Sequence, residues 1–473
     1  MITVPVNEQR PITLIGGAAW WMFGLALVVI ATTYFWADHR WETSTMPEFA
    51  AEVEEMSAST GGGHIWRRFG FIMLAGMGGV LVAWPNGNRV RIHGLLPWFV
   101  LALFAYSIAS VTWSLEPAIT LRRVLVLVFC FIGAIGVART LGPRQVCLLC
   151  LLLPSWFLML GVVAELAHGT FRPWVGEYRF AGTMHPNAQG YHLAIAFLAA
   201  NSLRKQAGGY TGILLVWMVV MFSFLVMTKS RTAVGAAVLG AFTLWWLQTP
   251  IRFRVLTGLL GATAGVIVLY TAFLVGFDFR ERLSPVVLIG RVEEASSFSG
   301  RIPIWNHVLT STEPRMWLGH GYQTYWTEEN VESLFDALDW SVLSSHSAYI
   351  DFYLMLGLVG WCMMLPMIIL SLSRSLRLFG VTGDTGWAFY AVLMVAAMLY
   401  GLMESATVDA TLPAFFLGVT FCQLAFFAPV PMVVGTEFEG NHRWGWDKDG
   451  PGRPDGIGRD IGWRWTRIDS VDG

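Results

Sequence analysis

Long apolar stretches, separated by short polar segments, run through most of the chain. A transmembrane helix needs about 20 mostly apolar residues to cross the hydrocarbon core of a bilayer. The pattern therefore predicts an all-α, polytopic transmembrane helix bundle of about 12 spans. The stretches fall near residues 12–36, 68–84, 95–113, 120–138, 146–167, 188–203, 212–228, 232–248, 255–275, 347–370, 387–403 and 411–428.

Basic residues in the short polar segments predict the orientation of this bundle. Loops on the cytoplasmic side of a membrane protein are enriched in Lys and Arg. Five loops on one predicted side each carry two basic residues, so we predict that this side and both termini are cytoplasmic. The pairs are Arg89 and Arg91, Arg139 and Arg144, Arg204 and Lys205, Arg252 and Arg254, and Arg374 and Arg377.

The polar segments also predict the domain organisation. Residues 1–428 form the transmembrane domain, and residues 429–473 form a cytoplasmic tail without apolar periodicity, which we expect to be disordered. Three larger segments face outward: an acidic insert at 37–67, a segment at 168–187, and a loop at 276–346 between spans nine and ten. Residues 12–36 are too long for a signal-peptide core and lack a small-residue cleavage site, so we expect a span there.

Composition agrees with membrane placement and narrows the function. Hydrophobic residues make up 55% of the 473 residues and charged residues 13%, whereas soluble domains carry about 25% charged residues. The net charge of −1 gives no basic surface for nucleic acid. Cys147 and Cys150 form a CxxC pattern without a second pair, which favours apolar helix residues over a zinc or redox site. Without an HExxH motif or a P-loop, we expect neither a metal site nor a cofactor.

Basic residues on the predicted outer side are candidates for chemistry, because the orientation rule does not account for them. Lys229, Ser230 and Arg231 form a turn with almost no loop, flanked by small residues, which would place cations inside the outer mouth of the bundle. Arginine keeps its charge and binds phosphate oxygens in pairs. The turn therefore predicts a site for an anionic group such as a diphosphate. Further outer arginines include Arg122, Arg123, Arg172 and Arg179.

Two outer histidines lie at predicted helix starts. His185 precedes Pro186 and Asn187, and the exposed N–H groups of a helix that begins at proline favour an anion or an acceptor oxygen. His346 lies among serines at the start of span ten, and histidine titrates near neutral pH, so His346 is a candidate general base. Capping or interfacial placement is the alternative for both.

Five segments in order resemble the bacterial O-antigen ligase and polysaccharide polymerase family, over roughly residues 70–428. They are VTWSLEPAITLRR (111–123), RFAGTMHPNAQGYHLAIAF (179–197), SRTAVGAAVLGA (230–241), SGRIPIWNHVL…PRMWLGHGYQTYW (299–326) and SSHSAYIDFYLMLGLVGW (344–361). The resemblance implies a metal-independent, inverting glycosyltransferase in the bacterial inner membrane. Its donor would be a glycan on undecaprenyl diphosphate at the periplasmic face.

The resemblance also implies roles for individual residues. Arg231 matches the arginine of the family's SR motif, and Arg301 matches the arginine of its G-R-x-x-x-W motif. His346 matches the histidine of its H-N-x-x motif, with Ser347 in place of the asparagine. We expect Arg231 and Arg301 to stabilise the leaving diphosphate, and His346 to deprotonate or orient the acceptor hydroxyl. Further expected substrate-binding residues are Arg122, Arg123, Arg179, His185, Asn187 and Lys229.

Several functions share this pattern. A ligase would pass the glycan to lipid A core or another final acceptor, and a polymerase would pass it to the next lipid-linked repeat unit of O-antigen, capsule or exopolysaccharide. Nothing marks a lipid A partner, which favours polymerisation or general polysaccharide assembly. A polytopic transporter and a non-catalytic component of an export or assembly complex are the alternatives. A transporter would predict an internal repeat and polar residues deep in several spans. The chain shows no internal repeat, its spans carry few deep charges, and its cations cluster at one face.

Overall fold

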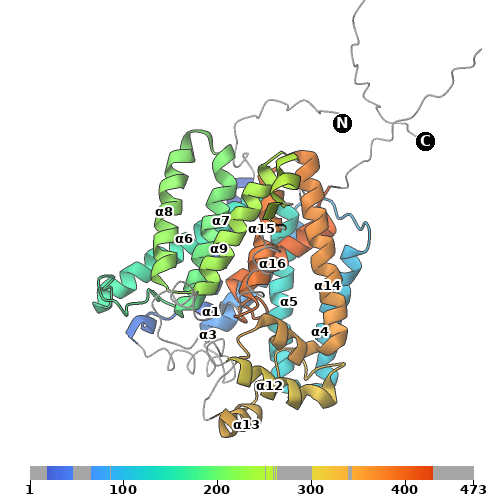
Figure 1. The fold of residues 1–473 in the computed structure, drawn as a ribbon. Coiled ribbons are helices and arrows are strands. Elements are labelled where there is room, and N and C mark those ends of the chain that lie inside the picture. Colours follow the sequence, from blue (N-terminus) through green and yellow to red (C-terminus); the bar gives the residue numbers. More distant parts are fainter. Residues whose placement is uncertain are drawn as a thin grey trace, which may run out of the picture. The chain divides into compact units, whose positions relative to one another are not determined.

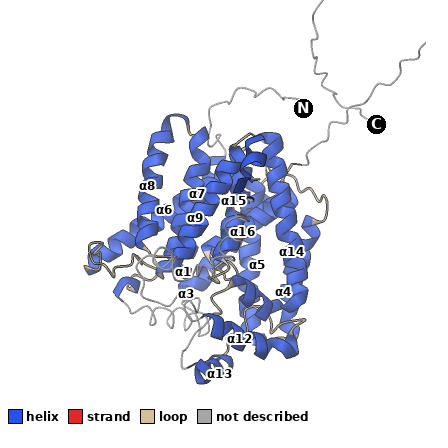
Figure 2. Cartoon of the chain, viewed as in Figure 1, coloured by secondary structure: helices blue, strands red, loops and turns tan. Residues whose placement is uncertain are grey.

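Helices form all the regular secondary structure of the described part of the chain in the computed structural model (Figure 2). That part comprises residues 19–45, 65–85, 87–250, 252–258, 260–261, 263, 301–338 and 344–429. The predicted all-α class is therefore confirmed. The main helices are α1 (Ala19–Asp38), α3 (Ile65–Ala83), α4 (Leu96–Ala109), α5 (Pro117–Thr140), α6 (Pro143–His168), α7 (Pro186–Leu203), α8 (Thr211–Met227), α9 (Arg231–Gln248), α12 (Arg301–Thr312), α13 (Glu328–Leu338), α14 (Ala348–Thr382), α15 (Thr385–Tyr400) and α16 (Leu412–Cys422).

Six of these helical segments are long and apolar enough to cross a membrane. They are Trp20–Asp38, Ile65–Ala83, Pro117–Thr140, Pro143–His168, Gly208–Met227 and Ala348–Thr382. Three shorter apolar helical segments, Leu96–Thr112, Thr385–Tyr400 and Leu412–Phe427, accompany them. Each predicted apolar stretch overlaps helical residues, although the ninth, 255–275, lies mostly outside the described residues. The count of twelve spans and the orientation stay predictions.

Several predicted features fall where little is described. Most of the acidic insert at 37–67, residues 276–300 of the outer loop and the tail from residue 430 lie outside the described residues. The outer loop is described from residue 301 to 338 and again from 344, and it contains α12 and α13. Cys147 and Cys150 are buried in α6, as expected for apolar helix residues.

Proline and glycine set several helix ends. Pro117, Pro143 and Pro186 occupy the first turn of α5, α6 and α7, where the missing N–H has no helical partner to lose. Gly169 and Gly383 follow α6 and α14 with φ angles of 67° and 66°, a left-handed conformation that glycine adopts without a Cβ clash. The start of α7 at Pro186 confirms the helix predicted after His185.

Helix α7 lies at the centre of a group that includes α6, α8, α9 and α15 (Figure 1). Most of its side chains are buried, including the polar Gln189 and His192. Neighbouring helices therefore separate α7 from lipid, which explains how a helix of moderate polarity is accommodated. A second group contains α3, α5 and α16 together with α4 and α14, and α15 packs against α14 as well as α9.

Small residues bring α3 and α5 into backbone contact. A Cβ at Gly78 would lie 2.4 Å from the carbonyl oxygen of Ile132, and a Cβ at Gly136 would lie 2.6 Å from the carbonyl oxygen of Gly78. Close approach through small residues is a common way for membrane helices to pack. The two glycines therefore fix the spacing of α3 and α5.

The outer loop is bonded into a break in α14. Gly357, with φ 61°, interrupts the helical backbone. The N–H groups of Leu358 and Val359 donate to the carbonyls of Met316 and Trp317. In return, the N–H groups of His320 and Gly321 donate to carbonyls of α14. The break in the helix therefore leaves these backbone groups paired with the loop.

Replacing Gly78 with valine should destabilise the bundle, because the new side chain would overlap the backbone of α5. Overpacking of this kind costs about 1–3 kcal/mol, so the unfolding midpoint of the detergent-solubilised protein should fall. Gly79→Val is the matched control, since nothing lies within 4 Å of a Cβ at that position. Equal midpoints for the two variants would contradict the proposed close contact.

Candidate functional site

A cavity of about 680 Å³ is lined by several of the charged residues predicted on the outer side, including Arg122 and Arg123. Its walls come from α1, α3, α5, α7 and α14, and from the segments that precede α14 and follow α15. The charged and histidine side chains that line it are Asp38, Arg40, Arg67, Arg68, Arg122, Arg123, His185, His192, His346, Asp351, Glu404 and Asp409. The cavity therefore combines cations, carboxylates and imidazoles from segments far apart in the sequence.

One wall of the cavity is rich in arginine. Arg122 and Arg123 come from α5, and Arg67 and Arg68 come from the start of α3. Arg40 follows α1. Two aspartates, Asp38 and Asp409, line the cavity as well and leave this wall with an excess of positive charge. The arrangement suits an anion with several phosphate oxygens.

Sequence reasoning found only part of this arginine wall. Arg122 and Arg123 were expected to bind substrate, whereas Arg40, Arg67 and Arg68 were not. Arg40 and Arg67 lie within the acidic insert at 37–67, and Arg68 follows it directly. The Arg67-Arg68 pair at the outer start of a predicted span was the available signal, because orientation does not account for basic residues there.

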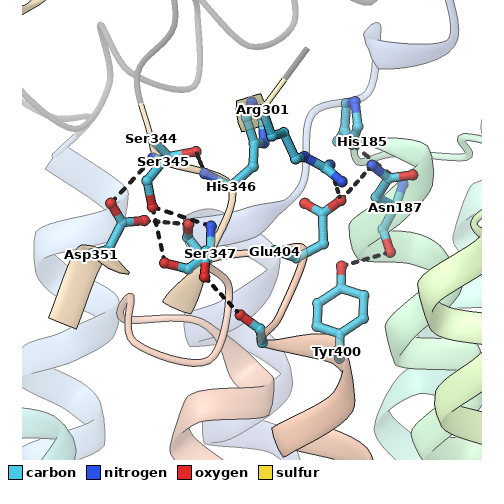
Figure 3. Close-up of polar contacts among 12 residues, drawn as sticks. His185, Asn187, Arg301, Ser344, Ser345, His346, Ser347, Asp351, Tyr400 and Glu404 are labelled. Atoms are coloured by element: carbon cyan, nitrogen blue, oxygen red, sulfur yellow. Dashed lines mark hydrogen bonds and ion pairs between the residues drawn. The ribbon is translucent and has the colours of Figure 1, made fainter. Parts of the chain in front are cut away.

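Glu404 connects three of the predicted site residues (Figure 3). Its Oε1 accepts hydrogen bonds from Arg301 Nη2 at 3.0 Å and from Asn187 Nδ2 at 2.8 Å. Asn187 Oδ1 in turn accepts from Arg179 Nη2 at 3.0 Å. Tyr400 donates its hydroxyl to the carbonyl of Asn187 at 3.0 Å. The start of α12, the start of α7 and the segment after α15 therefore meet at one carboxylate.

The ion pair between Glu404 and Arg301 is largely shielded from solvent, with side chains 13% and 15% exposed. Burial raises the pKa of Glu404, while the positive charge of Arg301 opposes that rise. Sequence reasoning passed over Glu404, although a lone glutamate beside the last two apolar stretches was visible. Its partners come from segments more than 100 residues away, and no local pattern reveals them.

His346 has a left-handed backbone conformation, with φ 51°. Such a conformation costs about 1–2 kcal/mol for a residue other than glycine, so neighbouring contacts must hold it. Asp351 Oδ1 accepts from the N–H of Ser345 at 3.1 Å, and Trp305 Nε1 donates to the carbonyl of Ser345 at 2.8 Å. Strained residues held by their surroundings often occur at functional sites. The contacts fix His346 at the edge of the cavity.

The environment of His346 disfavours its protonated form. Burial lowers its pKa, and the positive charges of Arg301 and His185 lower it further, to about 3. The imidazole is therefore neutral at physiological pH. A neutral imidazole can accept a hydrogen bond from a hydroxyl group, but with this pKa it takes up a proton only weakly.

Some of the predicted site residues line the cavity, and others do not. Arg122, Arg123, His185 and His346 line it, and Arg301, Asn187 and Arg179 belong to the network around Glu404. Neither Lys229 nor Arg231 lines the cavity. Lys229 donates to the carbonyl of Gly176, and Arg231 is the first residue of α9.

The turn at 229–231 reaches the site through Arg179. Arg179 Nε donates to the carbonyl of Thr228 at 3.1 Å, just before the turn, and its Nη2 donates to Asn187. The loop that carries Arg179 is held by Glu165, whose Oε1 accepts from the N–H groups of Ala181 and Gly182. The turn therefore supports the network and does not form the cavity wall that we expected.

A second cavity adjoins the first and is mainly apolar. It has a volume of about 280 Å³ and is lined by α4, α5, α14, α15 and α16. Met355 and residues 409–411 line both cavities. An apolar space inside the bundle therefore meets the charged cavity at its edge.

Comparison with known families identifies one region of the chain. Residues 216–365 match the family model Wzy_C, described as O-antigen ligase. This region runs from α8 into α14 and contains Arg231, Arg301 and His346. No curated protein matches the chain. The match confirms the predicted resemblance to the O-antigen ligase family.

Replacing Asp351 with alanine should loosen the segment that carries His346. The N–H groups of Ser345 and Trp326 would lose their acceptor, and an unsatisfied buried donor costs about 1–3 kcal/mol. We expect a lower unfolding midpoint in detergent for Asp351→Ala. Asp351→Asn should stay closer to the unaltered protein, because its amide oxygen can accept from both donors. Alanine and asparagine variants of equal stability would count against this role.

Proposed function

We propose that this chain, a membrane protein with an O-antigen ligase domain, transfers a glycan from undecaprenyl diphosphate to an acceptor hydroxyl at the periplasmic face. The family and the apolar helices already indicate a role in polysaccharide or O-antigen assembly. The observation that carries the finer proposal is one cavity that is lined by five arginines, a neutral histidine and a buried carboxylate. The proposed reaction is metal-independent and inverts the anomeric centre.

The arginine wall would hold the diphosphate of the donor. Arg122 and Arg123 lie at the outer start of α5, where an anionic headgroup can reach them from the membrane surface. Fixed positive charges stabilise negative charge as it develops on the leaving diphosphate. The adjoining apolar cavity would receive part of the isoprenoid chain, because a lipid diphosphate joins an apolar chain directly to an anionic group.

His346 would orient the acceptor hydroxyl. A neutral imidazole nitrogen can accept a hydrogen bond from that hydroxyl and direct its oxygen toward the anomeric carbon. Attack from the side opposite the diphosphate inverts the anomeric configuration. Because the diphosphate already activates the sugar, the reaction requires no nucleotide. Arg301 would contribute positive charge beside the reacting centre. The network of Arg179 and Asn187, supported by the 229–231 turn, would hold Arg301 in place.

Ligation and polymerisation use the same chemistry and differ in the acceptor. We favour polymerisation or general polysaccharide assembly, because nothing in the chain marks a lipid A partner. The glycan profile of a deletion strain separates the two activities. Lost chain length indicates a polymerase, and full-length chains that stay unattached indicate a ligase.

His346→Ala should reduce glycan transfer strongly at unchanged expression. Loss of a group that assists proton transfer or orients the acceptor lowers the rate by about 10²–10⁴-fold. The measurement is glycan transfer by purified protein in nanodiscs with a lipid-linked donor. His93→Ala is the control, because His93 is exposed and lies outside the cavity. Arg231→Ala is measured in the same assay. Full activity in both His346→Ala and Arg231→Ala would contradict the catalytic proposal.

Arg122→Gln and Arg123→Gln should weaken donor binding, because each removes a charged, two-pronged contact to phosphate. We expect a higher KM for the lipid-linked donor and a weaker dependence of that KM on salt, because fewer charge contacts remain to be screened. Arg172→Gln serves as the control, since Arg172 is exposed in the segment between α6 and α7 and does not line the cavity. An unchanged donor KM in the double variant would remove the arginine wall from the donor site.

A further inference from the structure

The Glu404 carboxylate uses its two oxygens differently. Oε1 accepts hydrogen bonds from Arg301 and Asn187, at 3.0 Å and 2.8 Å. Oε2 accepts no hydrogen bond from any residue that the structure describes, and Glu404 lines the charged cavity. In the view of Figure 3, Asn187 lies on one side of the carboxylate and His346 on the other. One oxygen is therefore anchored, and the other is available to a molecule in the cavity.

We propose that Glu404 Oε2 takes the proton from the acceptor hydroxyl during glycan transfer. This inference rests on the proposed transferase activity. The hydroxyl oxygen forms the new bond to the anomeric carbon, and the bond from that carbon to the diphosphate oxygen breaks. The electron pair of the broken bond leaves with the diphosphate. The hydroxyl proton moves to Glu404, which is thereby neutralised.

Electrostatics favours Glu404 over His346 as the final proton acceptor. Burial lowers the pKa of His346, and the positive charges of Arg301 and His185 lower it further, to about 3. Burial raises the pKa of Glu404, while Arg301 and Asn187 stabilise its ionised form and keep it available as a base. The two side chains would therefore divide the work: His346 orients the hydroxyl, and Glu404 receives its proton.

Hydrogen bonding disfavours the other carboxylates of the cavity. Asp351 accepts from Ser345 and Trp326 through Oδ1 and from Ser405 through Oδ2, so both of its oxygens are occupied. Asp409 accepts from Gln323 at 3.4 Å and lies near Arg123 of the arginine wall. Asp38 accepts from the N–H of Leu412 through Oδ2 at 3.2 Å. Among the described residues, the hydrogen bonds of Arg301 and Asn187 to a carboxylate go to Glu404 and to none of these three acids.

The charged and titratable groups around Glu404 define its response to pH. Arg301 faces it from α12, His185 from the start of α7, and His346 from the segment before α14. Asp351 lines the same cavity from the first turn of α14. A base works only when deprotonated, so kcat should fall as the pH drops through the pKa of Glu404. The acid limb should lie above the ordinary range of a glutamate.

Glu404→Gln is the direct test. The amide oxygen of glutamine can still accept from Arg301 and Asn187, so the network survives while the proton acceptor is lost. We expect kcat to fall by about 10²–10⁴-fold with an unchanged donor KM. The unfolding midpoint should fall, because Arg301 loses its buried counter-charge. Glu329→Gln is the matched control, because Glu329 is exposed on α13. Near-normal kcat in Glu404→Gln would overturn the proposal.

The pH profile separates Glu404 from His346. In His346→Asn the acid limb of kcat should stay at the same pH while the plateau falls, and in Glu404→Gln the limb should disappear. The opposite pattern would assign the proton to His346. Glu404→Asp retains a carboxylate and should be more active than Glu404→Gln; the reverse order would also overturn the proposal.

The same assay distinguishes failure of this inference from failure of the function on which it rests. If the unaltered protein transfers glycan and Glu404→Gln transfers it equally well, only the role of Glu404 is wrong. If the unaltered protein in nanodiscs transfers no glycan from a lipid-linked donor, the proposed function itself is wrong.

Discussion

Backbone hydrogen bonding inside the bilayer is the constraint on which the rest of this structure depends. A spanning segment must satisfy its N–H and C=O groups within the protein, yet α14 breaks at Gly357. Residues 316–321 of the outer loop supply the missing partners. The loop and the helix therefore form one structural unit. Arg301, on the loop, and Asp351, on the helix, both belong to this unit, so the two halves of the site are held together.

Charge is distributed unevenly around the cavity. Glu404 pairs with Arg301 and offsets its charge, whereas the wall formed by α1, α3 and α5 carries more arginines than acids. An anion is therefore drawn to that wall, and the region around Glu404 stays close to neutral. Burial keeps His346 deprotonated, and the positive charges of Arg301 and His185 beside it add to that effect. In the proposed reaction, anion binding and proton transfer would therefore fall to different residues of one cavity.

The sequence predicted the helices well and the site in part, for a physical reason. Apolar runs and prolines are local signals, so α7 was expected to begin at Pro186, and it does. The position of His346 at a helix start was also predicted from a local signal, the apolar stretch that follows it. Glu404 depends on Arg301 and Asn187, 103 and 217 residues away, and no periodicity encodes that pairing. Arg231 was expected among the cations at the outer mouth of the bundle, but it does not line the cavity. Arg179 links the residue before that turn to Asn187.

The glycine contact between α3 and α5 has a consequence at the membrane surface. Arg67 lies eleven residues before Gly78 on α3, and Arg123 lies ten residues before Gly133 on α5, so both arginines lie on the same end of the helix pair. The close backbone contact between the two helices therefore fixes how far apart these two arginines lie. If the cavity binds the proposed donor, Gly78 and Gly136 would influence that binding although they do not line the cavity.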